Sequence, residues 1–301
     1  MKDDQSLRFG AIVLQDLPWS DLVKLWQKFE SFGFDTTWLA DHYVNYTNPG
    51  GPWLEGWTTL AALANATSKI RIGTLVTSIP FRNPAILARQ AMTVDQISNG
   101  RLEIGIGAGA PGIIDPSYKM IGIDDWPSQE RVERLKEQVE ILDLLLRNTT
   151  ASYNGKYYKL NDAIVAPGPV QKPRPPIVVA GHVKGSLRVA AELADTWVSF
   201  GADFGSPIDT VVEKTKKRIA FIDTYCEKVG RDPMSLRRSL LVFGAEANTA
   251  FASENHFIEI VDRYTSLGIN ELIFFYPFFA PNQIAMFEKI AKETIPTLRK
   301  G

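Results

Sequence analysis

The sequence predicts an α/β protein built as a (β/α)8 TIM barrel. Short, continuous runs of apolar residues alternate with longer segments whose apolar residues recur at helical spacing. Continuous apolar strands that alternate with helices indicate a parallel sheet covered by helices. Eight such strand-and-helix units fit into 301 residues, and this favours a closed barrel over an open sheet.

The elements follow one another in regular order. The predicted strands cover residues 7–13, 36–40, 70–77, 102–106, 177–180, 196–200, 240–244 and 271–275. The predicted helices cover residues 19–33, 55–67, 84–98, 128–148, 186–193, 207–229, 253–267 and 283–299. Pro84 suits a first helical turn, because the N–H that it lacks would have no helical partner there.

One stretch interrupts this order, between the fourth helix and the fifth strand. Two short β-like pieces, around Ser152 and at residues 156–159, are joined through Asn154 and Gly155, a strong hairpin signal. A proline-rich connection at residues 167–176 follows. We interpret this stretch as an insertion within one barrel, and expect residues 1–301 to form a single domain.

Composition and charge limit the partners. The formal net charge is −1, whereas a nucleic-acid or membrane partner would normally require a basic excess. The one cysteine, Cys226, cannot form an internal disulfide, and no Cys/His cluster predicts a metal site. The charged N-terminal segment lacks an apolar stretch, and no long apolar run follows. We therefore expect a cytoplasmic protein.

A barrel carries its active site in the loops after the strands. Asp41 and His42 end the second strand, where a histidine can donate to a bound ring or carry a proton near neutral pH. Asp41 could orient His42, although adjacent residues on an extended chain point apart. The alternative is a loop histidine that only caps or packs.

Two further loops have compositions suited to a ligand. Residues 105–112 contain four glycines and two alanines, so a planar ring or a backbone could lie against them, although a simple tight loop is an equal alternative. Residues 180–186 join the fifth strand to a helix start, where free N–H groups, Lys184 and Ser186 could hold a phosphate. The alternative there is an ordinary capped helix.

Arg71 and Glu103 are predicted to form a structural pair. Alternation places Arg71 on one face of the third strand and Glu103 on one face of the fourth. If both faces point inward, the two charges meet at the barrel floor. Removing one partner of such a buried pair would cost roughly 3–5 kcal/mol.

Several segments together resemble one known family. The central segment, residues 90–102 running into 105–107, resembles the signature of the luciferase-like monooxygenase superfamily. The resemblance extends over nearly the whole chain, through residues 34–38 with Asp41 and His42, 72–84, 173–181 and 194–197. Residues 55–60 and 81–84 resemble the branch that depends on the deazaflavin coenzyme F420.

The resemblance implies roles for particular residues. Asp41 and His42 match positions beside the reactive ring, where the histidine stabilises or protonates the reacting species. The implied cofactor contacts are Thr74, Leu75 and Val76, with a non-proline cis peptide between Leu75 and Val76; Ala108 and Gly109 beside the ring; and Ala180, Gly181, His182 and Val183 at the phosphate. The predicted substrate contacts are Tyr43, Glu55 and Trp57. The pocket would be lined by an aromatic set near the barrel top: Tyr43, Trp53, Trp57, Phe81, Tyr276, Phe278 and Phe279.

One position departs from the family pattern. The deazaflavin sugar-phosphate dehydrogenases carry an acidic glutamate where this chain has Ala110. Alanine cannot supply a proton, so the resemblance does not extend to a sugar-phosphate substrate. His42 is the strongest remaining proton carrier, with Glu55 second.

The leading hypothesis is an F420-dependent oxidoreductase that exchanges hydride with a small, fairly apolar organic substrate. A second reading is an FMN-dependent monooxygenase supplied with reduced flavin by a separate reductase. A flavin-binding protein without catalysis is a third. A non-redox barrel is a fourth, with Lys184 the only lysine near a strand end. The resemblance also implies that a homodimer is possible.

Overall fold

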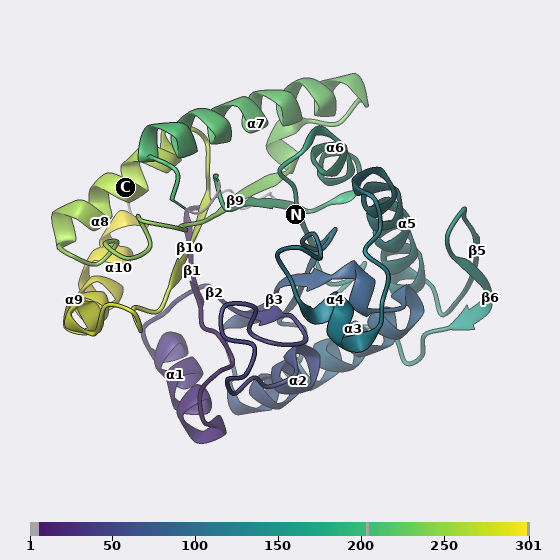
Figure 1. The fold of residues 1–301 in the computed structure, drawn as a ribbon, viewed down its shortest axis with the longest axis horizontal. Helices are drawn as coiled ribbons and strands as arrows, with labels where there is room; N and C mark the ends of the chain where they lie inside the picture. The colour runs from purple at the N-terminus through teal and green to yellow at the C-terminus, as the bar shows by residue number, and fades with distance from the viewer. Residues whose placement is uncertain (1–5, 203–204, 300–301) are drawn as a thin grey trace.

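The computed structural model describes residues 6–202 and 205–299. Within these residues, eight parallel strands close into a barrel with the helices outside it, which confirms the predicted fold class (Figure 1). The barrel order is β1, β2, β3, β4, β7, β8, β9 and β10, and β10 pairs with β1 to close it. The strands are β1 (Arg8–Ile12), β2 (Thr36–Asp41), β3 (Arg71–Ser78), β4 (Leu102–Gly107), β7 (Ile177–Ala180), β8 (Thr196–Ser199), β9 (Arg237–Leu241) and β10 (Glu271–Phe275).

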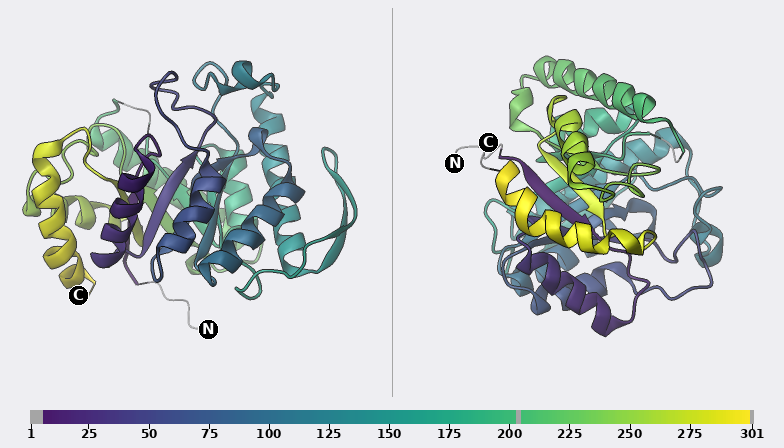
Figure 2. Two further views of the ribbon diagram at one scale, coloured as in Figure 1. Left: turned by 90° about the horizontal axis from the view of Figure 1, so that it is seen from below. Right: turned by 90° about the vertical axis from the view of Figure 1, so that its left-hand side faces the viewer.

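Helices follow the strands and cover the outside of the barrel (Figure 2). The larger helices are α1 (Trp19–Ser31), α2 (Gly56–Ala66), α3 (Pro84–Ser98), α5 (Ser128–Arg147), α6 (Lys184–Leu193), α7 (Ile208–Lys228) and α8 (Glu254–Thr265). A short helix, α4 (Ser117–Ile121), lies in the loop after β4. Across the described residues, we find no helix long and apolar enough to cross a membrane.

The predicted hairpin lies outside the barrel but has a different turn. Strands β5 (Thr150–Asn154) and β6 (Lys159–Ile164) are antiparallel, and Asn154 pairs with Lys159. The turn therefore spans residues 155–158 rather than the predicted dipeptide. The Glu137 carboxylate of α5 accepts hydrogen bonds from the N–H groups of Lys156, Tyr157 and Tyr158. This contact with α5 sets the turn and overrides the local signal of Asn154 and Gly155.

The seventh barrel strand begins three residues earlier than predicted. β9 covers Arg237–Leu241 and so includes two arginines, Arg237 and Arg238, whereas the predicted strand covers residues 240–244. The Arg238 side chain is buried and forms an ion pair with Asp223 of α7 at 2.5 Å. A charged residue can occupy a strand when its outward face packs against an acid on the covering helix.

The predicted C-terminal helix is interrupted. It divides into α9 (Ile284–Lys289), a π-helical turn (Ile290–Thr294) and α10 (Ile295–Leu298). Pro296 follows the π-helical turn. Its missing N–H removes one backbone bond from a continuous α-helix, and this is a common cause of such irregularity.

The base of the barrel is closed by ion pairs. Nε of Arg71 lies 2.5 Å from Oε1 of Glu103, which confirms the predicted pair. Arg8 of β1 donates to the same oxygen at 2.7 Å and lies 3.4 Å from Glu271. Burial alone would raise the pKa of Glu103, but Arg8 and Arg71 outweigh it and lower that pKa to about 2. The base of the barrel thus contains ionised acids and arginines whose opposite charges offset one another.

Above this base, large and small residues pack together inside the barrel. Trp38 of β2 is fully buried, and its ring lies against Gly73 of β3. A Cβ at Gly73 would come within 2.5 Å of that ring. The glycine thus provides the space that the indole fills.

Candidate active site

The third strand bulges where it approaches the mouth of the barrel. Its register with β4 shifts by one residue between Gly73 and Thr77, and the register with β2 shifts at the same place. The peptide bond between Leu75 and Val76, inside this bulge, is cis, as the resemblance implied. The Thr74 hydroxyl is fully buried, 2.8 Å from that of Thr77, and donates to the Gly105 carbonyl at 3.1 Å.

The bulge contributes to an apolar surface that we call the lumen floor. Five buried residues fill the interior of the barrel: Ile12, Trp38, Val178, Val198 and Ile273. Five partly exposed residues pack on them: Leu75, Val76, Ala180, Leu241 and Phe275. The five partly exposed residues come from β3, β7, β9 and β10, so together with the buried five they extend across the interior of the barrel. A flat apolar molecule can lie on such a surface.

The loop after β4 forms one wall beside the floor. Ala108 and Gly109 are partly exposed, and Gly109 has a positive φ of 81°. Buried Arg131 of α5 donates to the Gly109 carbonyl at 3.0 Å and the Ala110 carbonyl at 2.5 Å. It also forms an ion pair with Asp125. A single guanidinium therefore holds the wall in place.

The turn before α6 lies at the mouth of the barrel, and hydrogen bonds within it fix its shape. The Ser186 hydroxyl accepts from the N–H groups of His182 and Val183, at 3.2 and 3.4 Å. No side chain caps the start of α6, so its first N–H groups are available to an anion. The His182 ring accepts from the Phe200 N–H at 3.1 Å and packs on the Phe200 ring. Gly181 is buried, and its carbonyl accepts from the indole of Trp197.

His42 is paired with an acid that the sequence analysis did not single out. Its Nδ1 lies 2.8 Å from Oδ2 of Asp115, in the loop between β4 and α4. Burial alone would raise the pKa of Asp115, but hydrogen bonds from His42 and Ser117 outweigh it and lower that pKa. An ionised carboxylate only accepts hydrogen bonds, so Nδ1 carries a proton. The Nε2 atom has no partner among the described residues.

Asp41 is engaged elsewhere, and this corrects the expectation that it could orient His42. Its two carboxylate oxygens accept from Nε and Nη2 of Arg82, at 2.7 and 2.6 Å. The same guanidinium bonds Glu55 at 2.5 Å. Burial alone would lower the pKa of Arg82, but its bonds to the two acids outweigh it and raise that pKa. Side chains of adjacent extended residues point apart, so Asp41 faces Arg82 while His42 faces Asp115.

The three predicted substrate residues differ in position. Tyr43 is exposed. Glu55 caps α2, accepting from the N–H groups of Trp57 and Thr58. Trp57 is buried, and its indole donates to the Thr77 hydroxyl at 2.9 Å. Trp57 therefore supports the bulge from behind, which leaves Tyr43 and Glu55 as the accessible members of the set.

Sequence reasoning missed Asp115 and Arg131. Asp115 lies in a loop without periodicity, and Arg131 occupies a helix position where an arginine is usually solvated. The available signal for Asp115 was its place just after the glycine-rich segment 105–112, whereas nothing in the sequence around Arg131 pointed to that segment. Only the packing of the loop onto α5 and β2 shows their partners.

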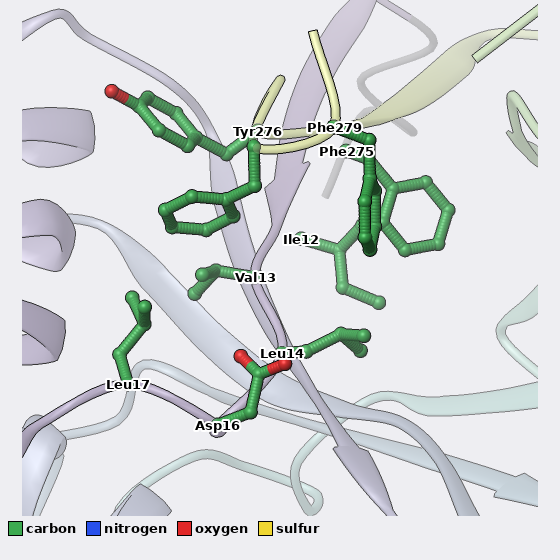
Figure 3. A pocket seen from close by; sticks show the side chains of 9 residues that line it. Ile12, Val13, Leu14, Asp16, Leu17, Phe275, Tyr276 and Phe279 are labelled. Atoms are coloured by element: carbon green, nitrogen blue, oxygen red, sulfur yellow. The ribbon is translucent and has the colours of Figure 1, made fainter. Parts of the chain in front are cut away.

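A small pocket opens between the ends of β1 and β10 (Figure 3). Its volume is about 190 Å³. The lining residues are Ile12, Val13, Leu14, Asp16, Leu17, Phe275, Tyr276, Phe278 and Phe279. Ile12 and Phe275 also belong to the lumen floor, so the pocket adjoins that surface.

A closed parallel barrel, with a bulged strand and polar side chains gathered at its mouth, defines a TIM-barrel enzyme. The chain belongs to the luciferase-like monooxygenase family, whose model matches residues 6–294.

Relatives in this family are oxidoreductases of two kinds. The F420-dependent glucose-6-phosphate dehydrogenase of Segniliparus rotundus is 27% identical, over 93% of this chain and 94% of that protein. The enzyme of the same name from Amycolatopsis mediterranei is 34% identical, but over 54% of this chain and 47% of its own length. The oxygenase component of the flavin-dependent trigonelline monooxygenase of Acinetobacter baylyi is 29% identical, over 78% of this chain and 62% of that protein.

A solved structure supports the fold. An F420-dependent secondary alcohol dehydrogenase, in complex with an F420–acetone adduct, superposes with a TM-score of 0.80. The match covers 96% of this chain and 99% of that one, at 19% identity. Together, the family and its relatives show that the chain is an oxidoreductase of the F420-dependent or flavin-dependent type.

Proposed function

We propose that the protein is a coenzyme F420-dependent oxidoreductase that exchanges hydride with a small organic substrate, and that residues 1–301 act as one domain. The observation that carries this proposal is the His42–Asp115 pair, which follows β2 at the mouth of the barrel that holds the lumen floor. It combines a proton carrier with a surface for a planar ring. The relatives matched over most of their own length include an F420-dependent enzyme.

The residues present fit such a cofactor. Leu75 and Val76 would support one face of the ring system from below, and Ala108 and Gly109 would border its edge. The N–H groups at the start of α6 would hold the phosphate, beside the turn at residues 180–183 that leads into the helix. When bound, the deazaflavin would supply or accept the hydride.

His42 would handle the proton that accompanies the hydride. With Nδ1 donating to Asp115, Nε2 accepts a proton from the substrate when the imidazole is neutral, and donates one when it is protonated. For an alcohol substrate that would give its hydride to the bound cofactor and become a carbonyl, Nε2 would accept the hydroxyl proton. In the opposite direction, with hydride supplied by the cofactor, Nε2 would donate a proton to the carbonyl oxygen.

A cofactor titration tests this proposal directly. The purified protein is titrated separately with oxidised F420 and with FMN, and binding is followed by absorbance and fluorescence. We expect saturable binding of F420 and little binding of FMN. Tight binding of FMN without binding of F420 would overturn the proposal.

An FMN-dependent monooxygenase is the second candidate, supported by the similarity to the trigonelline enzyme. Under this alternative, a separate reductase supplies reduced flavin. Oxygen consumption with reduced FMN and a candidate substrate is the discriminating measurement. A cofactor-loaded protein that turns over no substrate would instead favour a flavin-binding protein without catalysis. Light scattering at several concentrations tests the possible homodimer.

A further inference from the structure

We propose that the pocket between β1 and β10 is a substrate-recognition subsite for an apolar molecule that carries an ammonium or hydroxyl group, and that it rejects anions. This inference rests on the proposed function, because it names the substrate class of the same site. The evidence lies in the lining of the pocket, in one acid, and in the surface that the pocket shares with the lumen floor.

The residues that line the pocket favour a ligand that is largely apolar. Asp16 is the only charged group among the described residues that line the pocket; the others are aliphatic or aromatic. Pockets for drug-sized ligands are typically of about 300–1,000 Å³, so the 190 Å³ here suits a smaller molecule or one arm of a larger one.

Asp16 makes the pocket favour a ligand that carries a hydrogen-bond donor. The carboxylate faces the apolar lining between Leu14 and Leu17 (Figure 3). Among the described residues, its only hydrogen bond comes from its own backbone N–H. A partly buried carboxylate in apolar surroundings gains most from a donor that the ligand brings. Burial also raises the pKa of this carboxyl group, as is expected while it lacks a cationic partner.

The segment that carries Asp16 is fixed by its neighbour. Gln15 is fully buried, and its amide donates to the Ala40 carbonyl at 2.6 Å. Its backbone carbonyl accepts from the Leu54 N–H at 3.0 Å. These bonds tie the loop after β1 to β2 and to the segment before α2, so the carboxylate is held in position before a ligand arrives.

The pocket leads to the region where hydride would be exchanged. Ile12 and Phe275 line it, and both pack in the same cluster as Leu75 and Val76. A molecule anchored at Asp16 would therefore extend over the lumen floor. No lysine or arginine is found among the described lining residues. The repulsion between an anionic ligand group and the Asp16 carboxylate would therefore not be offset by a cation in the lining.

The test uses three probes that share one ring: cyclohexylmethylamine, cyclohexylmethanol and cyclohexanecarboxylate. Binding to the full chain is measured by ligand-observed NMR, without cofactor and with saturating F420. We expect the amine to bind roughly tenfold or more tighter than the carboxylate, with the alcohol between them. Equal or tighter binding of the carboxylate would overturn the inference.

Two variants test whether the preference for the amine depends on Asp16. We expect Asp16→Asn to weaken amine binding roughly tenfold while changing alcohol binding little. Asp21→Asn, which removes an exposed acid of α1, should leave all three probes unchanged. Unchanged amine binding in Asp16→Asn would also overturn the inference, provided that its melting temperature shows a folded protein.

The two proposals can fail separately. F420 binding to Asp16→Asn should match that of the unmodified chain, because Asp16 lies outside the proposed cofactor contacts. If F420 fails to bind but the amine preference is present, the subsite stands without the proposed cofactor. If F420 binds but no preference is seen, the cofactor assignment stands and the subsite is wrong.

Discussion

Asp115 and His42 are separated by 73 positions along the chain, yet their side chains lie 2.8 Å apart. The contact links the loop after β4 to the end of β2 and fixes which ring nitrogen of His42 carries a proton. The Tyr46 ring packs against the imidazole, and the indole of Trp53 donates to the His42 carbonyl. The histidine is thus oriented on several sides, while Nε2 has no partner among the described residues.

The first prediction concerns the His42–Asp115 pair. His42→Ala should lower kcat by roughly 10²–10⁴-fold, the usual contribution of a positioned acid or base. Asp115→Asn should have a smaller effect on kcat, because the amide oxygen can still accept from Nδ1 but no longer requires that nitrogen to carry the proton. Steady-state kinetics across pH check both variants.

Two further measurements separate catalysis from structure. F420 affinity should remain within a few-fold in both variants, and added imidazole should partly restore His42→Ala. His256→Ala, which alters a histidine on α8, should behave like the unmodified enzyme. Full turnover by His42→Ala would remove the proposed role.

The second prediction concerns Glu103 at the barrel base. Because folding lowers its pKa from 4.5 to about 2, the carboxylate contributes stability that is present above about pH 4.5. That contribution is lost as the pH falls toward 2. The shift corresponds to roughly 3 kcal/mol. Glu103→Gln should therefore lower the free energy of unfolding by about 3 kcal/mol at pH 7, and by much less near pH 2.

Urea denaturation across this pH range provides the check. Glu213→Gln is a matched control, because it removes an exposed acid that forms an ion pair with Lys217 on the same helix. Such surface pairs contribute about 0–1 kcal/mol. A loss in Glu103→Gln no larger than in this control would contradict the role assigned to the ion pairs at the base of the barrel.

The barrel, and the meeting of Arg71 with Glu103, could be predicted because both depend on periodicity along a strand. Because side chains alternate along a strand, the sequence shows which of them share a face. In a closed barrel, one face of every strand points into the interior. The partner of His42 could not be predicted this way. Asp115 lies in an irregular loop, and its position depends on contacts with Ser117 and with the end of β2. Likewise, the turn at residues 155–158 is set by Glu137 of α5, which local sequence cannot reveal.

The third prediction concerns Gly105, which lies under the bulge of β3. A Cβ at this position would come within 1.8 Å of the Thr74 carbonyl oxygen. That oxygen belongs to backbone and cannot move without distorting the strand. Gly105→Ala should therefore destabilise the protein by roughly 3 kcal/mol or more and weaken cofactor binding.

Thermal melts and the F420 titration measure both effects. Gly50→Ala is the control, because a Cβ there meets nothing within 4 Å. Its melting temperature and F420 affinity should be close to those of the unmodified protein. If Gly105→Ala behaves like Gly50→Ala, the bulge does not pack as described.

The fourth prediction concerns the hairpin. Glu137→Gln should weaken the bonds to the N–H groups of Lys156, Tyr157 and Tyr158, because a neutral amide accepts less strongly than a carboxylate. Amide hydrogen exchange should accelerate in the turn at residues 155–158, while the barrel strands keep their protection. Glu259→Gln on α8 should leave exchange in the turn unchanged. Protection in the turn that survives Glu137→Gln would show that other contacts hold it.

Arg82 connects three loops that are distant in sequence. From the segment before α3, it binds Asp41 at the end of β2 and Glu55 at the start of α2. The chain between these two acids, residues 42–54, is therefore anchored at both ends and includes the exposed Tyr43. The part of this segment between its anchors can change in length and sequence while the anchors stay in place, so a new substrate preference need not require a new barrel.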